Sequence, residues 1–99
     1  MSAYYVLTQT VTNQEKYISE YLPAVMPFLA KHGGEVIVAN LQATALQGEP
    51  ASGVVIIKFP SEENIRNFVG DPDYQPVKEI RLAATTDGNA VMTPGFKPV

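Results

Sequence analysis

The sequence contains a single histidine, His32, and its side chain could take part in chemistry. The unperturbed pKa of an imidazole, about 6.5, would let His32 shuttle a proton at the mouth of a cleft. His32 also directly precedes Gly33-Gly34, a typical helix stop, so it could instead be a cation that hydrogen-bonds the last carbonyl groups of a helix. We favour the second interpretation and keep His32 among the candidate catalytic residues.

Lys58 is a charged residue at the end of an apolar run. Because side chains alternate along a strand, Lys58 shares a face with Val54 and Ile56. If that face is enclosed, the lysine must pair with an anion, extend to water or lose its charge. Lys58 is therefore a candidate for anion binding or proton transfer, and equally for a strand-end lysine that reaches water at the rim.

Arg81 shares the inner side of a predicted helix with Tyr74 and Val77. Its guanidinium could hold a substrate carboxylate through two parallel hydrogen bonds. It could also tie its helix to Asp71, to Asp73 or to a nearby carbonyl group, and we favour that structural role. The candidate catalytic residues are thus Lys58, His32 and Arg81.

Tyrosines and one strand glutamine are candidates for the wall of a ligand pocket. A tyrosine offers a large apolar ring and a polar hydroxyl, so it suits an aromatic substrate, but it suits a core or an interface equally well. A glutamine in an otherwise apolar strand could orient a ligand or form an edge hydrogen bond, as could Asn40. The candidate ligand-binding residues are Tyr5, Gln9, Tyr17, Tyr21 and Tyr74.

The elements that must position these side chains follow the order βαββαβ. Aromatic and β-branched residues predict strands over residues 4–11, 35–41, 53–59 and 89–93, with a short additional strand over 44–46. Apolar residues at helical spacing predict a helix that ends at residue 32, a second over 62–69 and a third that begins after residue 73. Right-handed crossovers place the helices on one face of an antiparallel sheet.

The sequence also predicts where these elements bend and end. Pro23 and Pro27 remove helical hydrogen bonds, so we expect a bent or broken helix near Leu22. Residues 86–88, Thr-Asp-Gly, predict a turn before the last strand. Helix caps are expected at Thr12, with Glu15 completing a capping box, at Ser61 and at Asp73.

Both faces of the predicted sheet carry large apolar side chains. Tyr4 and Val6 in the first strand, like Val54 and Ile56 in the third, point to the face that the helices do not cover. An antiparallel sheet with one face in water should alternate apolar with polar residues. Burial of these side chains would contribute about 1.5–3 kcal/mol each. We therefore expect a second copy of the chain to cover this face in a homodimer.

Composition limits the class of protein. The 99 residues predict one domain over 1–99, and a net charge of −3 with scattered lysines and arginines argues against a nucleic-acid partner. The absence of cysteine, with a single histidine, argues against a zinc site and fits a cytoplasmic protein. We expect no membrane span and no signal peptide, because no long apolar run is present.

Three segments form a distinctive set: Val-Val-Ile-Ile-Lys-Phe-Pro-Ser over 54–61, Asp-Pro-Asp-Tyr-Gln over 71–75 and Ile-Arg-Leu-Ala-Ala over 80–84. With Tyr17 and the His-Gly-Gly of residues 32–34, they resemble the bacterial family called domain of unknown function thirteen-thirty, over nearly the whole chain. The resemblance implies a ferredoxin-like fold in the dimeric α+β barrel superfamily, where two sheets pack face to face. That superfamily includes cofactor-free oxygenases, isomerases and haem-dependent members, whereas the family itself has no settled function.

Two positions depart from the family pattern. Lys58 stands where many members have an acidic residue, and Gln47-Gly48 stands where Glu-Gly is common. A mechanism that requires carboxylates at those positions is therefore in doubt for this chain.

The function expected from the sequence is a homodimer that binds or converts a small organic molecule without a cofactor. If it is catalytic, the reaction would be proton transfer or oxygenation of a small aromatic or acidic substrate. The alternative is a non-catalytic dimer whose polar and aromatic residues serve packing or passive binding. A pocket that holds Lys58 or His32 would favour an enzyme, and a cleft filled by the protein's own side chains would favour the alternative.

Overall fold

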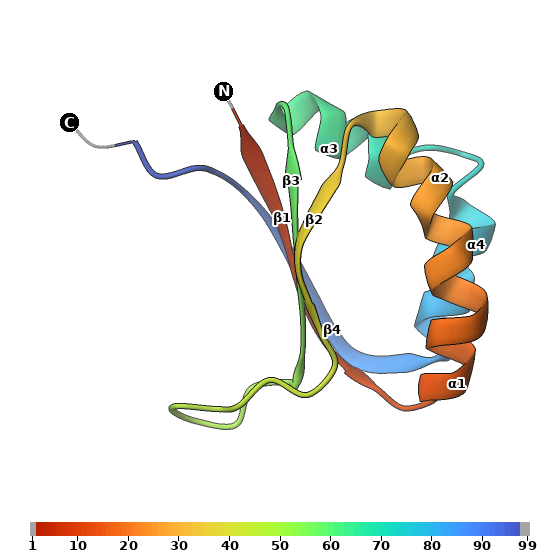
Figure 1. Cartoon of the computed structure of the whole chain (residues 1–99), viewed down its shortest axis with the longest axis vertical. Helices are drawn as coiled ribbons and strands as arrows, with labels where there is room; N and C mark the ends of the chain where they lie inside the picture. The colour runs from red at the N-terminus through yellow and green to blue at the C-terminus, as the bar shows by residue number, and fades with distance from the viewer. Residues whose placement is uncertain (1, 98–99) are drawn as a thin grey trace.

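A four-stranded antiparallel sheet carries helices on one of its faces (Figure 1). The computed structural model describes residues 2–97. The strands are β1 (Ala3–Val11), β2 (Glu35–Asn40), β3 (Gly53–Phe59) and β4 (Thr85–Pro94), and their order across the sheet is β2-β3-β1-β4. The predicted α+β class with a ferredoxin-like βαββαβ arrangement is confirmed.

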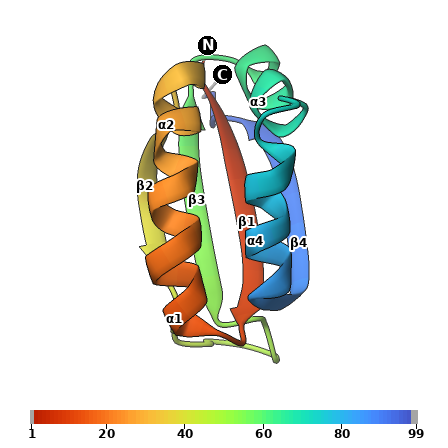
Figure 2. The same cartoon turned by 90° about the vertical axis from the view of Figure 1, so that its right-hand side faces the viewer.

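Five helical segments form the covering layer. The first three, α1 (Gln14–Lys16), η1 (Tyr17–Tyr21) and α2 (Leu22–His32), follow one another without a break, and η1 is a π-helical turn. The other two are α3 (Glu62–Val69) and α4 (Gln75–Ala83). Figure 2 shows α1 and α2 over β2 and β3, whereas α4 lies over β1 and β4.

The π-helical turn η1 accounts for the irregularity predicted near Leu22. The Leu22 N–H donates to the carbonyl of Tyr17, five residues back, in place of the usual four. Pro23 is the second residue of α2 and Pro27 lies inside α2 at an exposed position, and the run of helical segments continues through both prolines. Gly33 then ends α2 with a φ of 77°, in the left-handed conformation predicted for it.

Two of the three predicted helix caps are wrong. Ser61 caps α3 as expected, because its hydroxyl accepts from the N–H of Asn64. The first helix is capped by Asn13, not Thr12, since the Thr12 N–H is held by the Ala84 carbonyl at 2.9 Å and the helix starts one residue later.

Asp73 does not cap α4, which begins at Gln75. The Asp71 side chain accepts from the Asp73 N–H at 3.0 Å and organises the turn before this helix. Asp71, rather than Asp73, is therefore the acidic residue that shapes the α3–α4 connection.

The turn predicted at residues 86–88 is instead a bulge within β4. Thr10 of β1 pairs with Thr86 and Thr8 pairs with Asn89, so β4 has one residue more than β1 between these pairs. Asp87 adopts a φ of 57° there, which turn-forming residues tolerate best. The predicted short strand over 44–46 is also absent: these residues lie in the β2–β3 connection, where Leu46 is 98% exposed.

The core lies between the sheet and the helices, with Phe68 at its centre. The ring of Phe68 lies 4.5 Å from that of Tyr74, 5.7 Å from Phe59 and 6.2 Å from Tyr5, measured between centroids. Such contacts join α3, the start of α4 and two strands into one aromatic cluster.

The opposite face of the sheet is not covered by any segment within residues 2–97 (Figure 1). Strand pairing places Val38 beside Ile56, Ile56 beside Val6, and Val6 beside Val91. These four residues, here called the open-face row, form an apolar band across all four strands. Val91 is 59% exposed, so the band is accessible in this single chain.

Lys58 lies one row away on the same open face. It pairs with Tyr4 on one side and with Glu35 on the other. Its predicted position on a common face with Val54 and Ile56 is confirmed by this register.

Candidate functional site

An apolar cavity of about 250 Å³ lies between the η1–α2 segment and the sheet. Its mouth is formed by exposed side chains of the helix and of the β2 edge, among them Met26, which is 53% exposed, and Val36. Carbon atoms make up nearly all of its surface. The deeper walls are lined by Tyr5, Leu7, Tyr17, Tyr21, Val25, Leu29, Val55, Ile57 and Phe68.

Three of the tyrosines predicted to line a ligand pocket belong to this cavity. Tyr5 projects from β1, and Tyr17 and Tyr21 are the first and last residues of η1. The rings of Tyr17 and Tyr21 lie 5.3 Å apart, and both are buried. Tyr74 does not line the cavity, but its hydroxyl forms a 2.9 Å hydrogen bond with that of Tyr21.

Gln9 and Arg81 form a buried polar chain behind these tyrosines. The Arg81 Nη1 donates to the Gln9 Oε1 at 3.0 Å, and the Gln9 Nε2 donates to the Tyr17 hydroxyl oxygen at 3.2 Å. Because arginine has no acceptor atom, this contact fixes which end of the Gln9 amide faces the guanidinium. Gly53 makes room opposite Gln9, since a β-carbon there would lie 2.5 Å from the Gln9 carbonyl oxygen.

Of the partners predicted for Arg81, Asp71 and Asp73 are wrong, and the observed partner is a carbonyl oxygen, that of the Gln9 side chain. Arg81 bonds to Gln9 of β1, whereas Asp71 bonds to residues of α2. The Nε of Arg81 is buried and has no hydrogen-bond partner among residues 2–97. Arg81 is thus a buried charge whose hydrogen-bond partner is a neutral amide.

The environment keeps the tyrosines of the cavity in their neutral form. Burial raises the pKa of Tyr5 and of Tyr17, and the nearby charge of Arg81 lowers each pKa only in part. The pKa of Tyr21 is raised further, chiefly by burial and also by its contact with Tyr74. The hydroxyls therefore act as hydrogen-bond donors and acceptors at neutral pH.

His32 belongs to a second polar cluster, outside the cavity. Its Nε2 lies 2.8 Å from the Asp71 Oδ2, and the Lys31 Nζ donates to the same oxygen at 2.9 Å. Hydrogen bonds from Lys31 and His32 hold the pKa of Asp71 well below its usual range. The cluster ties the end of α2 to the α3–α4 connection, so His32 contacts a side chain rather than the helix carbonyls expected for it.

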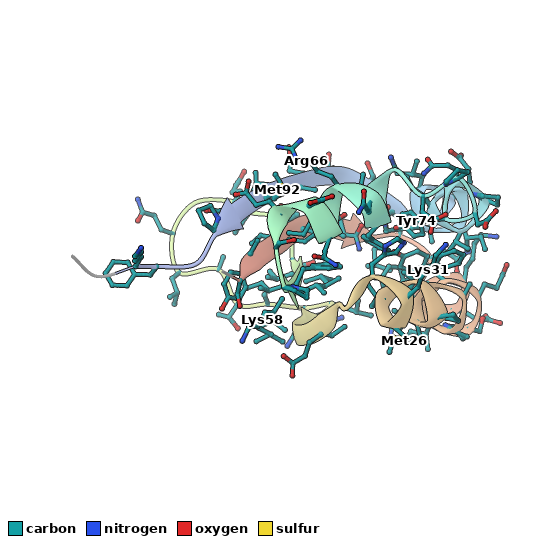
Figure 3. All side chains as sticks on the ribbon, turned by 90° about the horizontal axis from the view of Figure 1, so that it is seen from above. Met26, Lys31, Lys58, Arg66, Tyr74 and Met92 are labelled. Atoms are coloured by element: carbon teal, nitrogen blue, oxygen red, sulfur yellow. The ribbon has the colours of Figure 1, made fainter. Side chains whose placement is uncertain are left out.

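The candidate residues named from the sequence therefore fall into three places. Tyr5, Gln9, Tyr17, Tyr21, Tyr74 and Arg81 lie at or directly behind the cavity, His32 lies at the end of α2, and Lys58 lies on the open face. Figure 3 shows Lys31 and Tyr74 where α2 and α4 face each other, and Lys58 away from both helices.

Lys31, His32 and Asp71 form the helix-end cluster, and sequence reasoning missed that Asp71 is its centre. It also missed that Gln9 and Arg81 bond to each other, 72 positions apart in the chain. The only signals in the sequence were a glutamine in an apolar strand and an arginine on the inner side of a helix.

Two further observations bear on the kind of site. Within residues 2–97 no three histidine, cysteine or acidic side chains gather as a metal site would require, and no helix there has the length and apolar character to cross a membrane. A second hollow between α3 and β4, bordered by Arg66 and Met92, is more open to solvent than the cavity.

Comparison with protein families gives one match: residues 2–96 fit the model of the domain of unknown function DUF1330. No functionally curated protein matches the sequence.

Solved structures with this fold include proteins with and without a described activity. A protein of unknown function from Rhodopseudomonas palustris has a TM-score of 0.80 at 21% identity, over 98% of this chain and 84% of that one. SnoaB, a cofactor-independent oxygenase from Streptomyces nogalater, has a TM-score of 0.69 at 15% identity, over 99% and 96% of the two chains. A dimeric ferredoxin-like protein of unknown function from Thermobifida fusca has a TM-score of 0.52 at 16% identity, over 93% and 89%. At these low sequence identities, the similarity to the three structures shows a shared fold.

Proposed function

The chain belongs to the DUF1330 family of domains of unknown function, and we propose that it binds a small, largely apolar organic molecule in the cavity between the η1–α2 segment and the sheet. The observation that carries this proposal is the cavity itself, an apolar space of about 250 Å³ with three tyrosines in its wall. Apolar cavities of about 150 Å³ hold benzene, so this one suits a molecule of one or two rings.

Conversion of the bound molecule without a cofactor is the catalytic form of this proposal. The similarity to SnoaB, a cofactor-independent oxygenase, supports it at the level of the fold. Tyr5, Tyr17 and Tyr21 line the cavity and Arg81 reaches Tyr17 through Gln9, so these tyrosines and Arg81 would carry such chemistry.

Binding without catalysis is the alternative that one observation favours. His32 and Lys58, the residues best suited to proton transfer, do not line the cavity. The cavity wall contributes mostly carbon, so it offers few groups that could transform a bound molecule.

The proposal includes a homodimer formed through the open face, in the cytoplasm as predicted from composition. The open-face row would be buried between two sheets, where each of its side chains contributes stability. The β2–β3 connection and the C-terminal segment extend on the same side of the sheet (Figure 1), and their side chains Leu46 and Phe96 are 98% and 92% exposed. Exposed apolar side chains at both ends of an apolar face support association with a second copy. Lys58 would then lie in the interior between two copies.

The binding proposal is tested with a variant that fills the cavity. Ala39 lines the cavity from the β2 edge and is exposed, so Ala39→Trp should occupy the space without disturbing the core. We expect naphthalene to bind to the wild type, seen as shifts of the Val25 and Leu29 methyl resonances, and to bind at least about tenfold more weakly to A39W.

The matched control is Ala43→Trp, in the β2–β3 connection outside the cavity, which should bind like the wild type. Equal binding to wild type and A39W, or no binding of one-ring and two-ring aromatics to the wild type, would contradict the proposal.

A further inference from the structure

The buried charge of Arg81 has no counter-charge in the described part of the chain. The Arg81 side chain is 6% exposed, and no carboxylate of residues 2–97 forms an ion pair with it. The titratable groups that face it are all phenols, from β1, from η1 and from the residue before α4: Tyr5, Tyr17, Tyr21 and Tyr74. Burial raises the pKa of Tyr5, Tyr17 and Tyr21, so these three phenols do not balance the positive charge at pH 7.

A buried charge without a partner is unfavourable unless an opposite charge can approach it. The guanidinium cannot lose its proton to escape this, because arginine stays charged in proteins. An anion close to the tyrosines would therefore be stabilised, and in an apolar interior this attraction is much stronger than in water.

The hydrogen bonds from Arg81 to Gln9 and from Gln9 to Tyr17 indicate which hydroxyl an anion would contact. Arg81 holds the Gln9 amide so that its NH₂ group donates to the Tyr17 hydroxyl oxygen. That oxygen is an acceptor in this bond, so the hydroxyl hydrogen of Tyr17 is left to donate elsewhere. Tyr17 also lines the cavity, whereas Gln9 and Arg81 do not.

Tyr21 differs from Tyr17 in this respect. It lines the same cavity, but its hydroxyl is already engaged with the Tyr74 hydroxyl at 2.9 Å. The hydroxyls of the two neighbouring tyrosines of η1 thus differ: that of Tyr17 accepts from Gln9 and keeps its hydrogen to donate, whereas that of Tyr21 is paired with the Tyr74 hydroxyl.

We infer that the cavity takes an aromatic weak acid as its anion, with the acid oxygen hydrogen-bonded to the Tyr17 hydroxyl and with Arg81 acting through Gln9 as a positioning residue. This inference rests on the proposed function, because it assigns a chemical class to the molecule in that cavity. Phenolates, enolates and aromatic carboxylates share the required chemistry, a ring that fits apolar walls and one oxygen that carries negative charge.

The test compares two probes of almost the same shape. 4-Nitrophenol ionises near neutral pH with a change in visible absorbance, and 4-nitroanisole is its neutral methyl ether. At mildly alkaline pH the wild type should bind 4-nitrophenolate at least about tenfold more tightly than 4-nitroanisole, the factor expected for a hydrogen bond to a charged group.

Three variants separate the donor chain from simple packing. Tyr17→Phe removes the donor. Gln9→Glu places a carboxylate beside Arg81, and this carboxylate would also accept a hydrogen bond from the Tyr17 hydroxyl. Each should lower the affinity for 4-nitrophenolate about tenfold or more and leave that for 4-nitroanisole within about threefold. Tyr21→Phe is the matched control and should preserve the preference for the anion.

A spectroscopic readout distinguishes this role from a structural one. The pKa of bound 4-nitrophenol, read from its absorbance, should be higher in Q9E than in the wild type, because Arg81 is then neutralised by its new neighbour. If Q9E does not fold, the pair Y17F and Y21F still decides the matter.

The outcomes are distinct from those of the binding proposal. Binding of 4-nitroanisole without a preference for 4-nitrophenolate, or an equal preference in wild type and Y17F, would overturn the inference and leave the cavity as an apolar binding site. Failure of both probes to bind would overturn the cavity proposal as well.

Discussion

The two faces of the sheet bury apolar side chains in different ways. On the helix-covered face, residues such as Leu7 and Ile57 are almost fully buried within the single chain. On the open face, Val6 and Ile56 occupy the alternate positions of the same two strands and are only partly buried. The difference arises from the helices, which lie on one side because of the βαββαβ connections (Figure 2).

The polar residues also differ between the faces. The helix-covered face holds Gln9 and Arg81 in one connected chain that includes a tyrosine hydroxyl. The open face places Lys58 between Tyr4 and Glu35 at the border of an apolar row. One face is thus covered within the single chain, and the other presents the apolar residues that the proposed homodimer would bury.

The largest expected effect concerns the helix-covered face. Phe68→Ala should lower the free energy of unfolding by about 3–5 kcal/mol, because it removes a ring at the centre of the aromatic cluster and leaves a cavity. Chemical denaturation measures this loss. The adjacent Val69→Ala, at a position 37% exposed, should cost about 1 kcal/mol or less. Similar losses for both variants would mean that Phe68 is not the centre of the core.

The next effect concerns the open face. Val6→Asp places a charge in the open-face row and should raise the dimer dissociation constant more than about hundredfold, because an unpaired buried charge costs several kcal/mol. Sedimentation velocity over a concentration series measures it. Asn40→Asp, at the exposed end of β2, should change the constant by less than about threefold. A wild type that stays monomeric at micromolar concentration would refute the dimer.

A smaller effect, which depends on pH, separates the Lys31–His32–Asp71 cluster from the rest of the covered face. The pKa of Asp71 in the folded state lies below its ordinary value of 3.8, so the unfolded state binds the proton more readily. The stability that Asp71 contributes is therefore present above about pH 4 and is lost as the pH falls below it.

Thermal denaturation as a function of pH tests this assignment. Asp71→Asn should lower the melting temperature near neutral pH and should weaken its decrease in acid. Asp73→Asn is the control, because residue 73 contributes its backbone N–H rather than its side chain to the cluster. The same acid dependence in wild type and D71N would show that other carboxylates govern it.

Local patterns in the sequence predicted much of the fold and little of the site. The bounds of β3, the glycine that ends α2 and the cap at Ser61 depend on residues close together in the chain, and all three are confirmed. The site depends on contacts between distant residues. The bond between Gln9 and Arg81 spans 72 positions and that between His32 and Asp71 spans 39, and no local pattern specifies such partners.

The bulge in β4 illustrates the same limit at shorter range. The residue types of Thr86-Asp87-Gly88 predict a turn, yet these residues lie within β4, which pairs with β1. Gln9 lies opposite this bulge, between the pairs formed by Thr8 and Thr10. The turn-type residues Asp87 and Gly88 therefore lie in a strand beside Gln9 and help to frame the buried polar chain.

The π-helical turn has a consequence for how relatives of this chain should be compared. Successive residues of an α-helix are rotated by about 100°, so loss of one residue from η1 would turn Tyr17 away from the sheet while α2 stayed in place. A single-residue deletion, such as that of Ser19, would then turn the proposed donor Tyr17 away although every tyrosine remained in the alignment. Homologues are thus better sorted by the length of this segment than by the identity of its aromatic residues, since a gap there would mark the loss of the proposed Tyr17 donor.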